Sequence, residues 1–190
     1  MITWSPITVI LLTVNVLIFI TTYVYEDIIY EFVLVPIDIV RNPFSFLISS
    51  LSSMFLHANV VHIAFNMIAL VTLGRILEPH IDSKRFTIVY FASGFAGTGI
   101  HSAYTLITGN GIDVPVVGAS GTISGIIGIA AALGDRPAIF WLIIQVPFAI
   151  FGGSSIAYFA HIGGFIFGIT AGRIMVYLSR RKDHMGDYYM

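Results

Sequence analysis

Long runs of apolar residues alternate with short polar segments along this chain of 190 residues. A helix needs about 20 residues to cross the hydrocarbon core of a membrane, which is about 30 Å thick. Six runs approach or reach that length, at residues 6–25, 52–74, 86–107, 116–134, 137–151 and 156–178. The fifth run is short and contains Gln145 and Pro147, so it is the most prone to tilt. The pattern predicts an all-α, polytopic membrane protein, a bundle of six transmembrane helices.

The composition agrees with a membrane protein. Hydrophobic residues make up 57% of the chain and charged residues 10%, whereas soluble domains carry about 25% charged residues. The net charge is −1 and no basic face is visible, so we expect membrane lipid, and no nucleic acid, as a partner. No internal repeat divides the chain, and one membrane domain over residues 1–190 accounts for it. The first run lacks a basic leader and a small-residue cleavage site, which favours a retained helix over a signal peptide.

Basic residues indicate the orientation, because cytoplasmic loops carry an excess of Lys and Arg. With six spans, one side holds only Arg41, in a long connection over residues 26–51 that we expect to be an amphipathic loop at the membrane interface. The other side holds Arg75, Lys84, Arg85, Arg136, Arg173, Arg180, Arg181 and Lys182. The chain is therefore predicted to be a multi-pass protein of the cell membrane with both termini in the cytoplasm.

Few polar side chains inside the runs could do chemistry, and no Asp or Glu lies in the middle of one. The missing carboxylates weigh against a proton-coupled transporter and against an aspartic protease. No H-E-x-x-H motif offers a zinc site, and the absence of cysteine excludes a thiol nucleophile. A serine mechanism remains, for which we expect neither a metal nor a cofactor.

Three polar residues on three runs are predicted to share one depth. At 1.5 Å per helical residue, Ser120, His62 and His161 lie about 22, 20 and 18 Å from the cytoplasmic boundary, or roughly 8–12 Å below the outer surface of the core. Two stripes of small residues run along the fourth and sixth runs, at Gly121, Gly125 and Gly128 and at Gly164, Gly168 and Gly172. Such stripes let helices approach closely, so their packing would bring the serine and the last histidine together.

Three motifs, HANVVHIAFN at 57–66, GASG at 118–121 and AHIGGFIFG at 160–168, together resemble the rhomboid family of intramembrane serine proteases. Their order along the six runs also agrees with that family. The resemblance implies a Ser–His dyad in which Ser120 is the nucleophile and His161 is first the general base and then the general acid.

The resemblance also implies that the side chains of His62 and Asn66 stabilise the oxyanion. The backbone N–H of Ser120, near a helix N-terminus that follows Pro115, could supply a further donor. His62 and Asn66 are spaced i and i+4, which places them on one helix face. Glu78 ends a Gly-xxx-Glu segment like that of the family, and we interpret it as structural. The implied activity is endoproteolysis of transmembrane protein substrates near the outer membrane face. Because a hydrogen-bonded helix hides its peptide bonds, weak helix formers are expected near the cut.

The chain departs from the family pattern at two places. Ser124 stands where many members carry an aromatic residue that packs on the histidine, and its hydroxyl could reach the imidazole or a water. The first loop has Arg41 but no Trp-Arg pair, so no role is assigned to that loop. Two further histidines are interpreted as structural: His57, which helical spacing turns about 140° away from His62, and His101, which has no motif partner.

Each candidate residue has an ordinary alternative role. Ser120 could be a small residue at a helix contact, His62 and Asn66 could be hydrogen-bonding glue between helices, and His161 could be a satisfied core histidine. For the whole chain, one alternative is a catalytically inactive rhomboid-like protein that binds membrane clients. Another is a small-solute channel or transporter, which the missing carboxylates and repeats disfavour.

Overall fold

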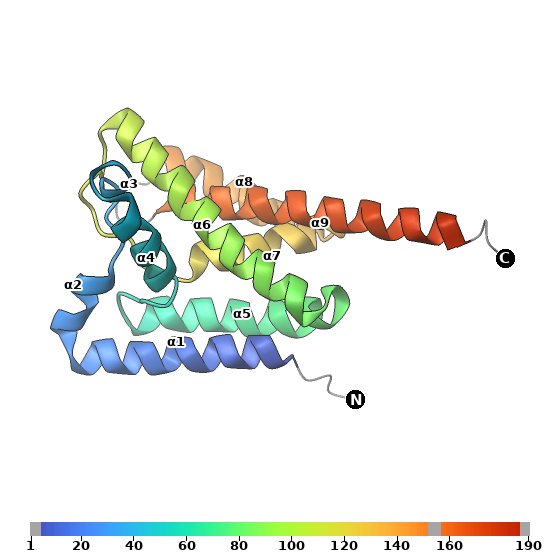
Figure 1. Cartoon of the computed structure of the whole chain (residues 1–190), viewed down its shortest axis with the longest axis horizontal. Coiled ribbons are helices and arrows are strands. Elements are labelled where there is room, and N and C mark those ends of the chain that lie inside the picture. Colours follow the sequence, from blue (N-terminus) through green and yellow to red (C-terminus); the bar gives the residue numbers. More distant parts are fainter. Residues whose placement is uncertain (1–4, 152–156, 187–190) are drawn as a thin grey trace.

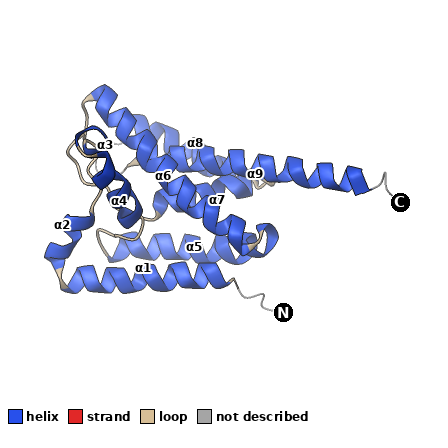
Figure 2. Ribbon diagram, in the orientation of Figure 1, coloured by secondary structure: helices blue, strands red, loops and turns tan. Residues whose placement is uncertain are grey.

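The computed structural model describes residues 5–151 and 157–186. Within these ranges the regular elements are helices (Figure 2), and one isolated antiparallel bridge joins Leu34 to Val116. By length and composition, three helical segments of the described chain could cross a membrane: Pro6–Val24, Val60–Ile81 and Tyr158–Arg181. The prediction of an all-helical membrane protein is confirmed to that extent, and the count of six crossings stays a prediction.

Each predicted run coincides with a helix, although several bounds differ. The helices are α1 (Pro6–Val24), α5 (Val60–Ile81), α6 (Ser83–Thr108), α7 (Ser120–Ala132), α8 (Arg136–Phe151) and α9 (Tyr158–Gly186). The second run was expected to start at residue 52, but α5 starts at Val60. The cause is local, since the Asn59 side chain accepts the backbone N–H of His62 at 2.8 Å and caps the helix.

The connection over 26–51 is more ordered than the predicted loop. It contains the short helices η1 (Glu26–Ile28), α2 (Ile29–Phe32) and α3 (Asp38–Arg41), followed by α4 (Pro43–Ser53). Asn42 starts α4, because its side-chain oxygen accepts the backbone N–H of Ser45 at 3.1 Å and Pro43 follows it. The location of this segment at a membrane interface stays a prediction.

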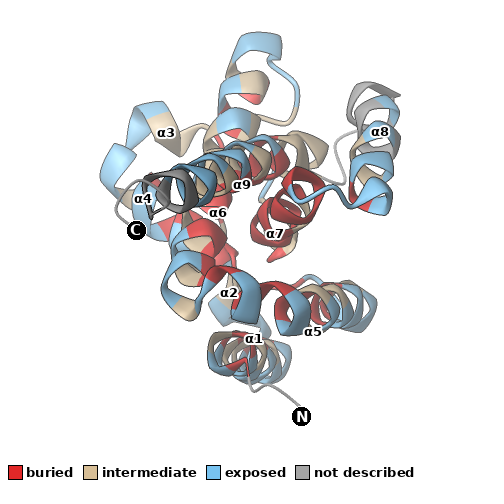
Figure 3. Cartoon of the chain, turned by 90° about the vertical axis from the view of Figure 1, so that its right-hand side faces the viewer, coloured by how far each residue is buried: buried red, intermediate tan, exposed pale blue. Residues whose placement is uncertain are grey.

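Helix α7 lies at the centre of the bundle. It packs against α9, α6, α5 and α8, and almost all of its residues are buried, as Figure 3 shows. Helix α1 packs on α5 at the edge, and α9 extends past its neighbours (Figure 1). The start of α1 and the end of α9 point to the same end of the molecule, while α2 to α4 lie at the opposite end.

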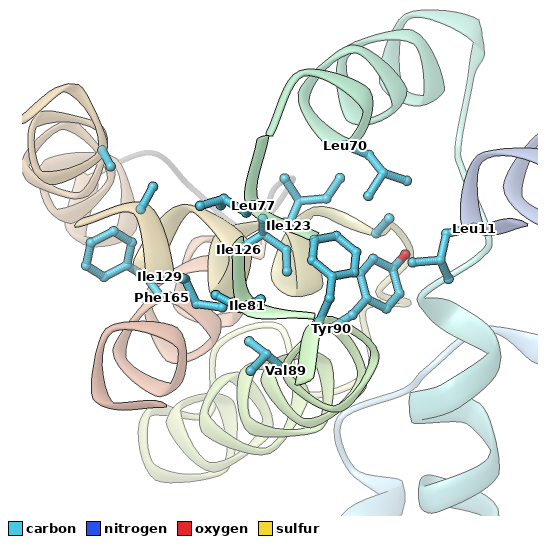
Figure 4. Close-up of a cluster of buried hydrophobic side chains, with 14 of the residues drawn as sticks. Leu11, Leu70, Leu77, Ile81, Val89, Tyr90, Ile123, Ile126, Ile129 and Phe165 are labelled. Atoms are coloured by element: carbon cyan, nitrogen blue, oxygen red, sulfur yellow. The ribbon is translucent and has the colours of Figure 1, made fainter. Parts of the chain in front are cut away.

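The apolar core fills the space between α7 and its neighbours. Its side chains come from α1 and from α5 to α9, and Figure 4 shows Tyr90, Leu70 and Ile126 among those that converge there. Tyr90 and Ile126 have no exposed surface. This core holds α7 at a fixed depth and rotation, and so fixes where its first residue lies.

The two glycine stripes pack on each other, as the sequence predicts. A side chain added at Gly164 would strike the backbone oxygen of Gly121, and one added at Gly168 would strike that of Gly125. One turn further, Gly128 lies against the backbone of Phe165. The backbones of α7 and α9 are therefore in direct contact over about two turns, which small residues alone permit.

Glu78 joins three helices at the end opposite α4. The carboxylate is buried and accepts the backbone N–H groups of Ile7 and Thr8 at 3.0 and 2.9 Å. It also accepts the hydroxyls of Thr8 at 2.8 Å and Ser83 at 2.7 Å. A carboxylate suits this position, because the first N–H groups of a helix lack intrahelical partners and carry partial positive charge. The geometry agrees with the structural interpretation of this residue.

Candidate active site

Ser120 and His161 meet at the end of the bundle that carries α4. Ser120 is the first residue of α7 and His161 lies in the first turn of α9. The Oγ of Ser120 is 2.8 Å from Nε2 of His161, a hydrogen-bond distance, and both residues are half-buried. The glycine packing of the two helices produces this approach, because it brings their backbones into contact one turn away from the pair.

The first loop holds the segment that precedes the serine. Leu34 and Val116 exchange two backbone hydrogen bonds of 3.3 and 2.8 Å, and Gly118 donates its N–H to the carbonyl of Ser53 at 2.9 Å. These bonds pair residues 116 and 118 with the first loop and with the end of α4, and for this reason α7 begins at Ser120 and not at the predicted residue 116. Sequence reasoning gave the first loop no role, and no motif in it signals this pairing.

His62 faces the same space from α5. The backbone N–H of Ala58 points at Nδ1 of His62 over 3.4 Å, which leaves the ring proton on Nε2 and makes that nitrogen a donor. Asn66 lies one turn further along α5, is buried, and donates from Nδ2 to the carbonyl of His62 at 2.9 Å. An amide nitrogen has two protons, so one N–H of Asn66 is available for a further acceptor.

Gly118 packs directly against His62. A Cβ placed there would lie 2.8 Å from Nε2 of His62 and 3.5 Å from Oγ of Ser120. The φ angle of Gly118 is +128°, a conformation that residues with a side chain rarely adopt. The absence of a side chain at Gly118 therefore lets the backbone pass close to His62 and Ser120 without displacing the imidazole.

His57 does not face away from His62, contrary to the helical-spacing prediction. The two ring centroids are 5.1 Å apart in an edge-to-face arrangement, and His57 is buried. The prediction was wrong because His57 precedes the start of α5 at Val60, so the 100° rotation per helical residue does not apply to it. His101, from α6, lines the same cavity as Ser120. No motif around His101 in the sequence indicates this location.

The hydroxyl of Ser124 is engaged within its own helix. It donates to the carbonyl of Ser120 at 2.6 Å, and the residue is fully buried. Rings from elsewhere lie beside the imidazole of His161: Trp141 of α8 and Tyr158 of α9, each with its centroid 6.0 Å away. The contact with Trp141 was not predicted, because nothing in the sequence relates the faces of the two helices.

A cavity of about 860 Å³ opens onto the pair. Its walls include Ser120, His161, His62 and Asn66, together with the segment 114–118. Among the described residues, no group of three or more His, Asp or Glu side chains could hold a metal ion. The arrangement therefore places a hydroxyl, an imidazole and hydrogen-bond donors around one open volume, which is the set of groups that nucleophilic acyl transfer uses.

Comparison with known proteins relates most of the chain to one family. The family model described as "Rhomboid domain" matches residues 47–178. The chain is 33% identical over 132 residues to "Rhomboid protease GluP" of Bacillus subtilis, which covers 64% of the chain and 24% of that protein. It is 30% identical over 115 residues to "Rhomboid protein 1, mitochondrial" of Saccharomyces cerevisiae, and the match covers 60% of the chain and 32% of that protein. It is 31% identical over 130 residues to "Rhomboid-type serine protease 2" of Emericella nidulans, and the match covers 63% of the chain and 25% of that protein. The matched part spans about a quarter to a third of these relatives.

Proposed function

This chain belongs to the rhomboid family, and from that premise we propose that it is an intramembrane serine endopeptidase that hydrolyses peptide bonds of transmembrane proteins. The observation that carries the proposal is the distance of 2.8 Å between Oγ of Ser120 and Nε2 of His161. A free hydroxyl is a weak nucleophile near neutral pH, and a hydrogen-bonded imidazole activates it by taking its proton. Relatives named as proteases support the same class of reaction.

In the proposed reaction, Oγ of Ser120 forms a bond to the scissile carbonyl carbon while its proton passes to Nε2 of His161. The carbonyl oxygen becomes an oxyanion. His161 then gives its proton to the amide nitrogen, the C–N bond breaks, and an acyl-enzyme remains. A water molecule, deprotonated by the same imidazole, hydrolyses the ester and restores the hydroxyl.

We assign the oxyanion to the cavity that Ser120, His62 and Asn66 line. The Nε2–H of His62 is the first donor, supported by the Ala58 N–H that points at Nδ1 and leaves the ring proton on Nε2. The second is the N–H of Asn66 that the His62 carbonyl leaves unused, and the third is the backbone N–H of Ser120, which as the first residue of α7 has no intrahelical acceptor. Donors fixed in place stabilise the charge that develops in the transition state.

The proposed topology is one membrane domain over residues 1–190 with six crossings and both termini in the cytoplasm. The positions of the start of α1 and the end of α9 at the same end of the molecule support an even number of crossings. Helix α7 has 13 residues and is therefore about 20 Å long, shorter than a core of about 30 Å. With its last residue at the cytoplasmic boundary, Ser120 lies below the outer surface, and the cavity gives water access to it.

The proposed substrates are transmembrane helices whose cleavage region unwinds easily, because a helix must open before its carbonyl can enter the cavity. The test is cleavage of a model transmembrane substrate by the purified protein in proteoliposomes. We expect Ser120→Ala and His161→Ala each to abolish cleavage while thermal unfolding remains near that of the wild type. Substrate binding without cleavage by the wild type would instead support the inactive, client-binding alternative.

A further inference from the structure

The imidazole of His161 lies between rings from two helices. Tyr158, from the same helix, meets it edge-on at an interplanar angle of 82°, with centroids 6.0 Å apart. Trp141, from α8, meets it at 42° over the same distance. His161 thus depends on a second helix for one of the rings beside it.

Trp141 also contacts the next turn of α9. Its ring stacks on Phe165 at an interplanar angle of 20°, with centroids 6.1 Å apart. Phe165 follows His161 by four residues and therefore lies on the same face of the helix. It is 1% exposed and belongs to the apolar core. The indole is therefore held against a fixed core ring while it touches the imidazole.

Helix α7 offers no comparable ring at the nearest turn. Ser124, one turn after Ser120, is small, and its hydroxyl is bonded to the Ser120 carbonyl at 2.6 Å. Immediately after Ser124, the stripe of α7 that faces α9 continues with Gly125 and Gly128. Among the described residues, the ring of another helix that lies beside the imidazole is Trp141 of α8.

We propose that Trp141 is a positioning residue that holds the imidazole of His161 in the rotamer that directs Nε2 at Ser120. A histidine side chain has several staggered rotamers, and only one of them keeps the 2.8 Å contact. Activity scales with the fraction of molecules in the competent state. The packing of α8 against α7 and α9 thereby sets the reactivity of the dyad, although α8 contributes no reacting group. This inference rests on the proposed function.

The first test uses two substitutions of Trp141 and one control on the same helix. Trp141→Leu keeps an apolar side chain but removes the ring, and we expect kcat to fall about tenfold, equivalent to about 1.4 kcal/mol, with KM unchanged. Trp141→Phe restores a ring and should recover most of that loss. Phe140→Ala removes an aromatic side chain that is 62% exposed and should leave kcat unchanged. Thermal unfolding of each variant is measured alongside.

Several results would overturn the positioning role. One is an unchanged kcat in Trp141→Leu. Another is an equal loss in Trp141→Leu and Trp141→Phe, and a third is a loss in Phe140→Ala as large as in Trp141→Leu. A parallel fall of kcat and of the unfolding temperature across all three variants would identify Trp141 as a structural residue only.

A second measurement does not need protease activity. The chain has two tryptophans, so Trp4→Phe leaves Trp141 as the only tryptophan, whose emission is followed with excitation selective for indole. A protonated imidazole quenches indole fluorescence at contact distance, so acidification should lower the emission in this background, and His161→Leu should remove most of that decrease. An equal decrease without His161 would contradict the contact. If the wild type cleaves no substrate but this quenching is present, the proposed function fails and the ring contact stands.

Discussion

Replacement of Gly118 by alanine tests the assignment of His62 as an oxyanion donor. The new methyl group would lie 2.8 Å from Nε2 and Cε1 of His62, closer than carbon atoms approach one another in proteins, so either the ring or the segment 116–118 must move. A displaced ring no longer holds the Nε2–H of His62 in the direction of the proposed oxyanion. The substitution therefore acts on the reaction and not only on the fold.

The expected magnitude has two parts. The backbone angle of +128° at Gly118 strains any residue with a side chain, which costs about 1–3 kcal/mol of folding stability. Loss of one oxyanion donor lowers kcat by about 10²–10³, or about 2.7–4 kcal/mol of transition-state stabilisation. Unfolding measurements should show only the loss of folding stability. Cleavage by a partly unfolded sample should show both the loss of stability and the loss of transition-state stabilisation.

The matched control is Gly134→Ala. Gly134 has a φ of +99° in the turn after α7, and no heavy atom lies within 4 Å of a Cβ placed there. The substitution Gly134→Ala therefore introduces backbone strain without a steric clash and without contact with the cavity. Cleavage by the folded fraction, measured in proteoliposomes, should fall at least about 100-fold in Gly118→Ala and stay within about threefold of wild type in Gly134→Ala. Equal turnover in the two variants would refute the assignment.

Three further predictions concern single side chains near or below the site. Ser124→Ala should slow cleavage no more than about tenfold, because the Ser124 hydroxyl donates to the Ser120 carbonyl and contacts no reacting atom. Complete loss of kcat in this variant would contradict the prediction. Glu78→Gln should lower the free energy of unfolding by about 1–3 kcal/mol, since an amide cannot accept all four hydrogen bonds that the carboxylate accepts; unchanged thermal unfolding would be the contrary result. Burial and the neighbouring His62 ring lower the pKa of His57 from 6.5 to about 4. The unfolded chain thus binds this proton at higher pH than the folded chain, and stability should fall between about pH 6.5 and 4. The free energy of unfolding of His57→Gln should fall less steeply over that pH range. If it falls as steeply as that of the wild type, protonation of His57 is not the cause of the pH dependence.

The packing that joins serine to histidine could be predicted from the sequence. Glycines spaced three and four apart on two apolar runs give each helix a narrow face of small residues, and such faces have few alternatives to packing on each other. The structure pairs Gly121 with Gly164 and Gly125 with Gly168. Because both stripes begin within a turn of Ser120 and His161, that pairing also determines the distance between the two side chains.

The contacts outside regular helices could not be predicted in this way. His57 was placed with a helical wheel, although the chain at that residue has not yet become helical. The backbone pairing of Leu34 with Val116 joins two irregular segments far apart in sequence, and it leaves no periodic pattern in either. Trp141 meets His161 only because of how α8 is rotated against α9, and the apolar surface of α8 is compatible with many rotations.

The central claim is that Ser120, activated by His161, is the nucleophile. The most direct measurement is reaction of the purified protein with a fluorophosphonate probe, followed by peptide mapping of the adduct by mass spectrometry. The proposed mechanism predicts a single adduct on Ser120 that is lost in both Ser120→Ala and His161→Ala. An adduct on Ser124, or labelling that persists in Ser120→Ala at the rate of the wild type, would contradict it.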